Sequence, residues 1–253
     1  MSATRIALLA AIGAAGGFLS GAFGVGGGFI MVPMLVTLMH FDQRRAAATS
    51  LLAIVPTSLA GIIGYLVEGN VHVWAGLLIA LGGALGSVIG TRLLRALSLA
   101  WLRWLFVALL LVVAVQSLVE IASRDSHIEL TWGAGVGLVV LGLVMGVASG
   151  LFGIGGGVVV VPALIVLFDA SDLVARGTSL LAMAPTAVVG SVANVRHDLA
   201  QPLDGLVVGL VAAATSVGGV AFAHRISPTT GSWLFFLLLA VIIGQVVVRA
   251  VRS

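Results

Sequence analysis

The chain alternates between long apolar stretches and short polar connections. Eight windows carry no charged residue, and they cover residues 6–41, 46–67, 71–91, 104–119, 130–168, 177–195, 205–223 and 226–248. A transmembrane helix needs about 20 predominantly apolar residues. Six of the windows have roughly this length, so each of them predicts one helix that crosses a membrane.

The first and fifth windows are too long for a single crossing. They span 36 and 39 residues, which as straight helices would measure roughly 54–58 Å. The hydrocarbon core of a bilayer is only about 30 Å thick. Both windows also carry a glycine cluster near the middle. We therefore expect each of them to form a broken helix that folds back on itself.

The chain is an internal duplication with one constant offset. Gly24-x-Gly26-Gly27-Gly28 recurs 129 residues later as Gly153-x-Gly155-Gly156-Gly157, and Thr49-Ser50 recurs as Thr178-Ser179. A single register across both halves indicates a repeat rather than chance matching of glycines. The predicted repeats are residues 1–125 and 130–253, within one integral membrane domain.

The arginines predict how the halves are oriented. If the first and fifth windows fold back, nine arginines lie on the N-terminal side and three on the other. The nine are Arg5, Arg44, Arg45, Arg92, Arg95, Arg103, Arg196, Arg249 and Arg252, and the three are Arg124, Arg176 and Arg225. The positive-inside rule then places both termini in the cytoplasm. Each half makes an odd number of net crossings, so we expect two inverted repeats, each with a Gly-broken first segment and three transmembrane helices.

Composition narrows the class of protein further. Hydrophobic residues make up 60% of the chain and charged residues 8%, and the mean hydropathy is +1.25. So few charges exclude a soluble globular protein and leave an all-α polytopic membrane protein. The N-terminal apolar run continues far beyond the core of a signal peptide, so we expect it to be retained.

The residue types present argue against several kinds of chemistry. The chain has no cysteine, and its histidines do not pair at metal-ligand spacing, so we expect neither a metal nor a cofactor. No basic run with interleaved aromatics suggests a nucleic-acid partner. No catalytic set is apparent, so we do not expect an enzyme. No charged residue lies inside a window, which disfavours transport through a relay of intramembrane carboxylates.

The glycine clusters are the first candidate site. A bare glycine backbone can leave the helix, and a discontinuous helix presents N–H groups and a positive dipole end that attract anions. Duplicated transporters place such breaks at the interface of the repeats. Close helix packing through small residues is the alternative. The candidate substrate-binding glycines are Gly26, Gly27, Gly28, Gly155, Gly156 and Gly157.

Polar side chains on the following helices complete the candidate site. Thr49, Ser50, Thr178 and Ser179 could donate hydroxyl hydrogen bonds to a bound anion, although such residues also bond their own helix backbone. Asn194 has no repeat equivalent of its kind, since Tyr65 stands in its place. We include Asn194 as a candidate because one site needs only one copy, with a polar helix end as the alternative.

The paired motifs resemble those of the sulfite exporter TauE/SafE family, also called the toluene-sulfonate uptake permease (TSUP) family. The resemblance rests on Gly-x-Gly-Gly-Gly-x-x-x-x-Pro, from Gly24 to Pro33 and from Gly153 to Pro162, and on Thr-Ser-Leu-Leu-Ala-x-x-Pro-Thr in both halves. It implies a multi-pass transporter in the bacterial inner membrane that exports small sulfur-containing anions such as sulfite, sulfoacetate or other organosulfonates. An anion channel and a transporter of another small organic anion remain alternatives. Direction, coupling ion and oligomeric state stay open.

Overall fold

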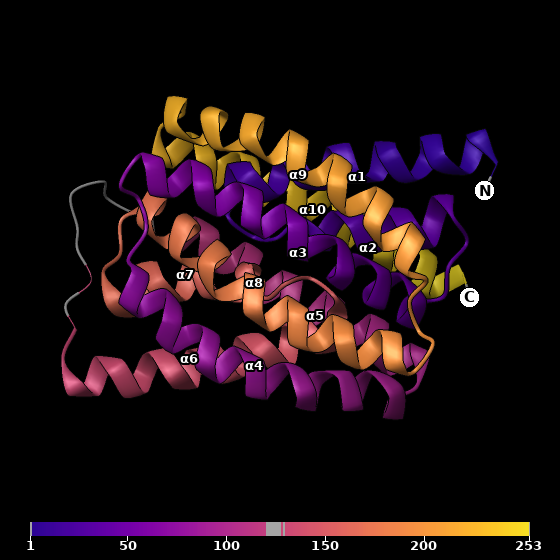
Figure 1. Cartoon of the computed structure of the whole chain (residues 1–253), viewed down its shortest axis with the longest axis horizontal. Helices are drawn as coiled ribbons and strands as arrows, with labels where there is room; N and C mark the ends of the chain where they lie inside the picture. Colours follow the sequence, from indigo (N-terminus) through magenta and orange to yellow (C-terminus); the bar gives the residue numbers. More distant parts are fainter. Residues whose placement is uncertain (1, 120–127, 129, 253) are drawn as a thin grey trace.

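The computed structural model describes residues 2–119, 128 and 130–252. This part of the chain forms ten α-helices and no strand (Figure 1). The helices are α1 (Ala3–Phe23), α2 (Gly28–Leu38), α3 (Gln43–Val67), α4 (Val73–Ala96), α5 (Leu99–Val119), α6 (Trp132–Phe152), α7 (Gly157–Phe168), α8 (Asp172–Arg196), α9 (Pro202–Arg225) and α10 (Pro228–Arg252). Eight of them are long and apolar enough to cross a membrane. The predicted all-α polytopic membrane fold is confirmed.

Each overlong window consists of one long and one short helix. The first window divides into α1 and α2 around residues 24–27, and the fifth divides into α6 and α7 around residues 153–156. The short helices α2 and α7 have 11 and 12 residues, which is about half of a membrane crossing. The predicted breaks in the helices are therefore present at the glycine clusters.

Contacts at one end of the bundle bring together the first turns of three helices. Asp204 in α9 accepts hydrogen bonds from Arg5 in α1, at 2.6 Å, and from Arg45 in α3, at 3.4 Å. Because α1 and α3 begin at the same end, the chain from α1 through α2 goes out and returns. Figure 1 shows the two termini at this end, on the right.

The halves pack through glycines that lie directly against backbone carbonyls. A Cβ on Gly17 of α1 would collide with the carbonyl oxygen of Ala212 in α9, and one on Gly146 of α6 with that of Gly83 in α4. These two contacts are related by the 129-residue offset. The outward faces carry many exposed large apolar side chains, which suits contact with lipid.

The charge-free windows locate the helices but misplace several of their ends. Helices α3, α5, α8 and α9 begin three to five residues before their windows, and α4 continues five residues past its window. The expectation that charged residues stand outside the membrane helices is therefore wrong. Asp172, Arg176 and Asp204 lie inside candidate spans and are almost fully buried. Ion pairs among these residues and neighbouring arginines lower the cost of burying them.

Candidate functional site

The two helix breaks have the same backbone geometry. Gly24 ends α1 with φ 68°, and Gly27 begins α2 with φ 68°. In the second half, Gly153 has φ 69° and Gly156 has φ 79°. Positive φ is strained for residues with a Cβ, whereas glycine adopts it freely. The glycine motif therefore allows two left-handed turns, each joining a full-length helix to a half-length one.

The two breaks are buried and touch each other. A Cβ on Gly28 would collide with the carbonyl oxygen of Gly153, and a Cβ on Gly157 would lie 2.6 Å from the carbonyl oxygen of Gly24. The contact is reciprocal, since each pair follows from the other by the repeat offset. The structure thus brings the two predicted glycine clusters together, but with backbone against backbone at these points.

Two predicted serines bind the breaks across the halves. Ser50 of α3 donates a hydrogen bond of 2.8 Å to the carbonyl oxygen of Gly153. Ser179 of α8 donates one of 2.9 Å to the carbonyl oxygen of Gly24. Both hydroxyls are buried. In this conformation, their protons hold the opposite break in place.

The predicted threonines and Asn194 have different surroundings. Thr178 Oγ1 accepts a hydrogen bond of 2.9 Å from the backbone N–H of His72. Thr49 Oγ1 has no hydrogen-bond partner among the described residues. The Asn194 side chain is fully buried, and within the described part of the chain neither its amide oxygen nor its nitrogen has a partner. Asn194 lies 15 residues beyond Ser179, or about 22 Å along α8, so it is not beside the Ser179–Gly24 contact.

A buried ion pair beside the first break was not predicted from the sequence. Arg176 is 5% exposed and Asp172 is 3% exposed. Arg176 Nη1 donates a hydrogen bond of 2.7 Å to the carbonyl oxygen of Ala22, and Nη2 lies 3.5 Å from Asp172 Oδ2. A Cβ on Gly24 would lie 2.5 Å from the Cα of Arg176. A guanidinium is therefore fixed at the turn where α1 ends.

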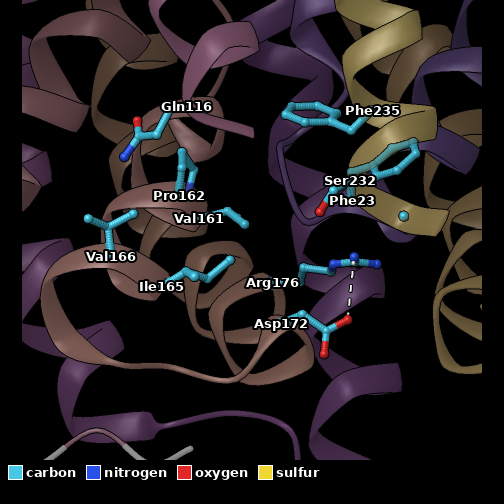
Figure 2. Close-up of a pocket in the computed structure, with 11 residues that line it drawn as sticks. Phe23, Gln116, Val161, Pro162, Ile165, Val166, Asp172, Arg176, Ser232 and Phe235 are labelled. Carbon is cyan, nitrogen blue, oxygen red and sulfur yellow. Dashed lines mark ion pairs between the residues drawn. The ribbon is translucent and has the colours of Figure 1, made fainter. Parts of the chain in front are cut away.

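Arg176 faces a small cavity, shown in Figure 2. The cavity has a volume of about 60 Å³ and is bounded by α1, α5, α7, α8 and α10. Figure 2 shows Arg176 close to Ser232 and Phe23, with Val161, Pro162 and Ile165 of α7 on the opposite side. The wall is mostly apolar, and among the described residues its charged groups are the Arg176 guanidinium and the Asp172 carboxylate. A small anion could bind the guanidinium there if it competed with Asp172.

One sequence signal could have revealed Arg176. Ser171 caps α8 through a hydrogen bond from the N–H of Val174, and a Ser before an acidic residue is a recognisable helix start. From that start, Asp172 and Arg176 fall at i and i+4 on one helix face. The windows end at charged residues, so Asp172 and Arg176 fall outside the window that begins at residue 177 and are not recognised as part of the helix.

Among the described residues, no three His, Asp or Glu side chains come close enough together to hold an ion. The described groups near the breaks offer hydrogen bonding and charge: backbone N–H groups, hydroxyls, the Arg176 guanidinium and the Asp172 carboxylate paired with it.

Sequence comparisons relate the chain to a family of membrane proteins. A sequence profile of the family described as "Sulfite exporter TauE/SafE" matches residues 5–246. A "Probable membrane transporter protein" of Xylella fastidiosa (strain Temecula1) is 31% identical over 199 residues, which cover 76% of each chain. The "Probable membrane transporter protein YdhB" of Bacillus subtilis is 29% identical over 179 residues, covering 70% of this chain and 73% of the relative. An archaeal relative from Methanocaldococcus jannaschii, "Probable membrane transporter protein MJ0441", is 28% identical over 168 residues, 62% of this chain and 60% of its own.

Proposed function

Because the chain belongs to the TauE/SafE family of membrane transporters, we propose that it exports small sulfur-containing anions such as sulfite, sulfoacetate or another organosulfonate. The observation that carries the proposal is the reciprocal contact of the two helix breaks. There the N-terminus of α2 lies against the carbonyl oxygen of Gly153 at the end of α6, and the N-terminus of α7 lies against that of Gly24 at the end of α1. The positive ends of both short helix dipoles therefore lie at the interface of the halves.

The proposed binding residues are the glycines of both breaks together with Thr49, Ser50, Thr178, Ser179 and Asn194. In the present conformation the breaks are in contact and the two serines donate to break carbonyls. Entry of an anion therefore requires the breaks to part. Parting would free the serine hydroxyls and the first N–H groups of α2 and α7 to bind the anion.

We propose further that the halves are inverted in the inner membrane, with both termini cytoplasmic. Arg5, Arg45 and Asp204 meet at the end where α1, α3 and α9 begin. At the other end, Asn70 contacts His224, and His72 contacts Thr178. These contacts support a return of the first segment to its starting side. The arginine-rich end would then be cytoplasmic.

Flux through the purified protein tests the function. Proteoliposomes would be assayed with sulfite, sulfate, sulfoacetate, taurine and acetate under a potassium–valinomycin potential without a pH gradient. A potential of 100 mV is worth about 2.3 kcal/mol per charge, enough for roughly a 50-fold gradient of a monoanion. We expect saturable flux of at least one sulfur anion, stimulated by counter-substrate. Non-saturable flux without counter-transport would favour a channel. Flux of acetate alone would contradict the assignment to sulfur anions.

A further inference from the structure

The cavity that Arg176 faces has a counterpart in the other half of the molecule. A second cavity of about 30 Å³ is lined by residues of α2, α3, α5 and α10. The two linings correspond position by position at the repeat offset: Val161 with Val32, Pro162 with Pro33, Phe235 with Phe106 and Gln245 with Gln116. The duplicated fold therefore builds the same recess twice.

Among the described residues, each cavity is lined by one arginine, but the two arginines are not repeat equivalents. Arg176 lines the first cavity, and Arg103 of α5 lines the second. Their equivalent positions hold Ala47 and Ser232. The duplication alone does not place an arginine at either position. Each half obtains its cation from a different helix, and both cavities end up with one guanidinium. We call them the Arg176 cavity and the Arg103 cavity.

The two cavities lie on opposite sides of the paired breaks. Val161 and Pro162 follow Gly157 by about one turn of α7, and Val32 and Pro33 follow Gly28 by about one turn of α2. Since α2 and α7 start at the contact of the breaks and lead away from it, each leads to its own cavity. Along α10 the cavities are 13 residues apart, from Ser232 to Gln245, or about 20 Å.

The Arg176 guanidinium is only loosely engaged by its acidic neighbour. Its 3.5 Å separation from Asp172 is longer than the 2.7–2.9 Å of a charge-assisted hydrogen bond. A guanidinium has five N–H donors; the Ala22 carbonyl accepts from one of them, and the Tyr65 hydroxyl is a further hydrogen-bond partner of Arg176. Ser232 and Gln116 add neutral donors to the lining. An entering anion can therefore compete with Asp172 for the guanidinium.

The size of the Arg176 cavity limits what it can hold. About 60 Å³ of such space accommodates roughly four water molecules. That is the scale of an inorganic oxyanion with four or five heavy atoms, and it is small for a sulfonate with a carbon chain. The Arg103 cavity, at about 30 Å³, holds roughly two water molecules, so it must widen to take the same anion.

We propose that the Arg176 cavity and the Arg103 cavity are two anion-binding sites, one on each side of the barrier formed by the paired breaks. A small inorganic oxyanion of the sulfite class binds at one guanidinium, crosses when the breaks part, and leaves from the other. This inference rests on the proposed function for the sulfur chemistry of the anion. Under the proposed topology, the Arg176 cavity opens toward the periplasm and the Arg103 cavity toward the cytoplasm.

The experiment measures the KM of sulfite flux from each face, in right-side-out and inside-out membrane vesicles. Arg176→Gln should raise the KM about tenfold or more for sulfite supplied on the Arg176 side. Arg103→Gln should do so on the other side. Arg176→Lys should recover part of the loss, because it keeps the charge but not the planar fork. Arg196→Gln, an exposed change of the same charge at the end of α8, should leave both KM values within about twofold.

A second variant keeps the test decisive if Arg176→Gln fails to fold. Gly231 lines the same cavity, and a Cβ there would lie 2.8 Å from Arg176 Nη2. Its repeat equivalent is Leu102, a buried leucine, so Gly231→Leu copies a residue that this fold already accommodates. It should fill the cavity and raise the KM on the same side as Arg176→Gln.

The outcomes separate this inference from the proposed function. Sulfite flux with wild-type KM on both faces in Gly231→Leu and Arg103→Gln would overturn the two-site inference and leave sulfite transport intact. A wild-type protein that carries no sulfur anion, yet binds nitrate or formate in a manner abolished by Gly231→Leu, would overturn the sulfur assignment. The second result would still support the cavity as an anion site.

Discussion

Ser179 Oγ lies 2.9 Å from the carbonyl oxygen of Gly24, a residue 155 positions away in the other half. Ser50 and Gly153 form the same contact in reverse, at 2.8 Å. Each half therefore holds the broken helix of the other by a buried hydrogen bond. Parting the breaks would expose or reassign both bonds.

Removal of the Ser179 hydroxyl should destabilise the protein. We expect Ser179→Ala to lower the free energy of unfolding by about 1–2 kcal/mol, because the Gly24 carbonyl loses a buried donor. Thermal unfolding in detergent, followed by tryptophan fluorescence, measures the change. Ser58→Ala is the matched control, because Ser58 bonds only carbonyls of its own helix, those of Ile54 and Val55. Equal losses in the two variants would show that the contact between the halves adds nothing.

The glycines of the breaks should not tolerate a side chain. A Cβ on Gly27 would collide with the carbonyl oxygen of Gly16, and φ there is 68°. We expect Gly27→Ala to abolish flux while the protein still inserts into the membrane. Gly69→Ala is the control for backbone strain alone, because Gly69 has φ 71° but a Cβ there would meet no heavy atom within 4 Å. It should cost about 1–2 kcal/mol of stability and keep flux. If Gly27→Ala retained as much flux as Gly69→Ala, the close approach of Gly27 to the Gly16 carbonyl would not be required for transport.

The proposed topology can be tested with single cysteines, since the chain has none. Ser2, Glu68 and His197 are exposed. In intact cells, an impermeant maleimide should label Glu68→Cys and should label Ser2→Cys and His197→Cys only after the membrane is opened. Labelling of all three positions from outside would contradict the inverted arrangement.

Asp204 should stabilise the end where α1, α3 and α9 begin. Its side chain is 2% exposed and pairs with Arg5 and Arg45. We expect Asp204→Asn to lower the free energy of unfolding by about 1–3 kcal/mol, less than for a fully buried pair because both arginines are partly exposed. Asp42→Asn removes an exposed charge from the cap of α3, and asparagine still caps a helix. Its cost should stay below about 0.5 kcal/mol. If Asp204→Asn and Asp42→Asn gave similar unfolding curves, the ion pairs of Asp204 with Arg5 and Arg45 would not stabilise this end of the bundle.

Asp172 should compete with the anion for Arg176. If the Arg176 cavity binds an oxyanion, Asp172→Asn removes the competing charge 3.5 Å away. We expect sulfite to bind several-fold more tightly, as measured by calorimetry on the purified protein. Asp169→Asn is the control: Asp169 is exposed, with φ 49°, and asparagine tolerates this conformation. Weaker sulfite binding in Asp172→Asn than in Asp169→Asn would mean that Asp172 positions Arg176 rather than competing with the anion.

Several features of the candidate site could be predicted because they are local or repeated. The breaks at Gly24–Gly27 and Gly153–Gly156 follow from glycine and from window length. The repeat offset identifies Ser50 and Ser179 as candidates, because the two serines occupy equivalent positions in the two halves. The partners of these serines could not be predicted, since Gly24 and Gly153 are distant in sequence. Gln116 and Phe235 carry no motif at all, and they line a cavity only because α5 and α10 pack beside α7.

Hydropathy, window length and glycine placement are enough to establish a duplicated, all-helical membrane protein with two broken helices. The effects of these properties depend on the thickness of the bilayer and on the local backbone, so they can be inferred before it is known how the helices pack. The burial of Arg176 and Asp172, the contact of the two breaks and the guanidinium in each of two matching cavities emerge only when the helices are packed. Burial and pairing depend on which helices are neighbours. A charge beside an apolar window can face water or a cavity, and the neighbouring helices determine which.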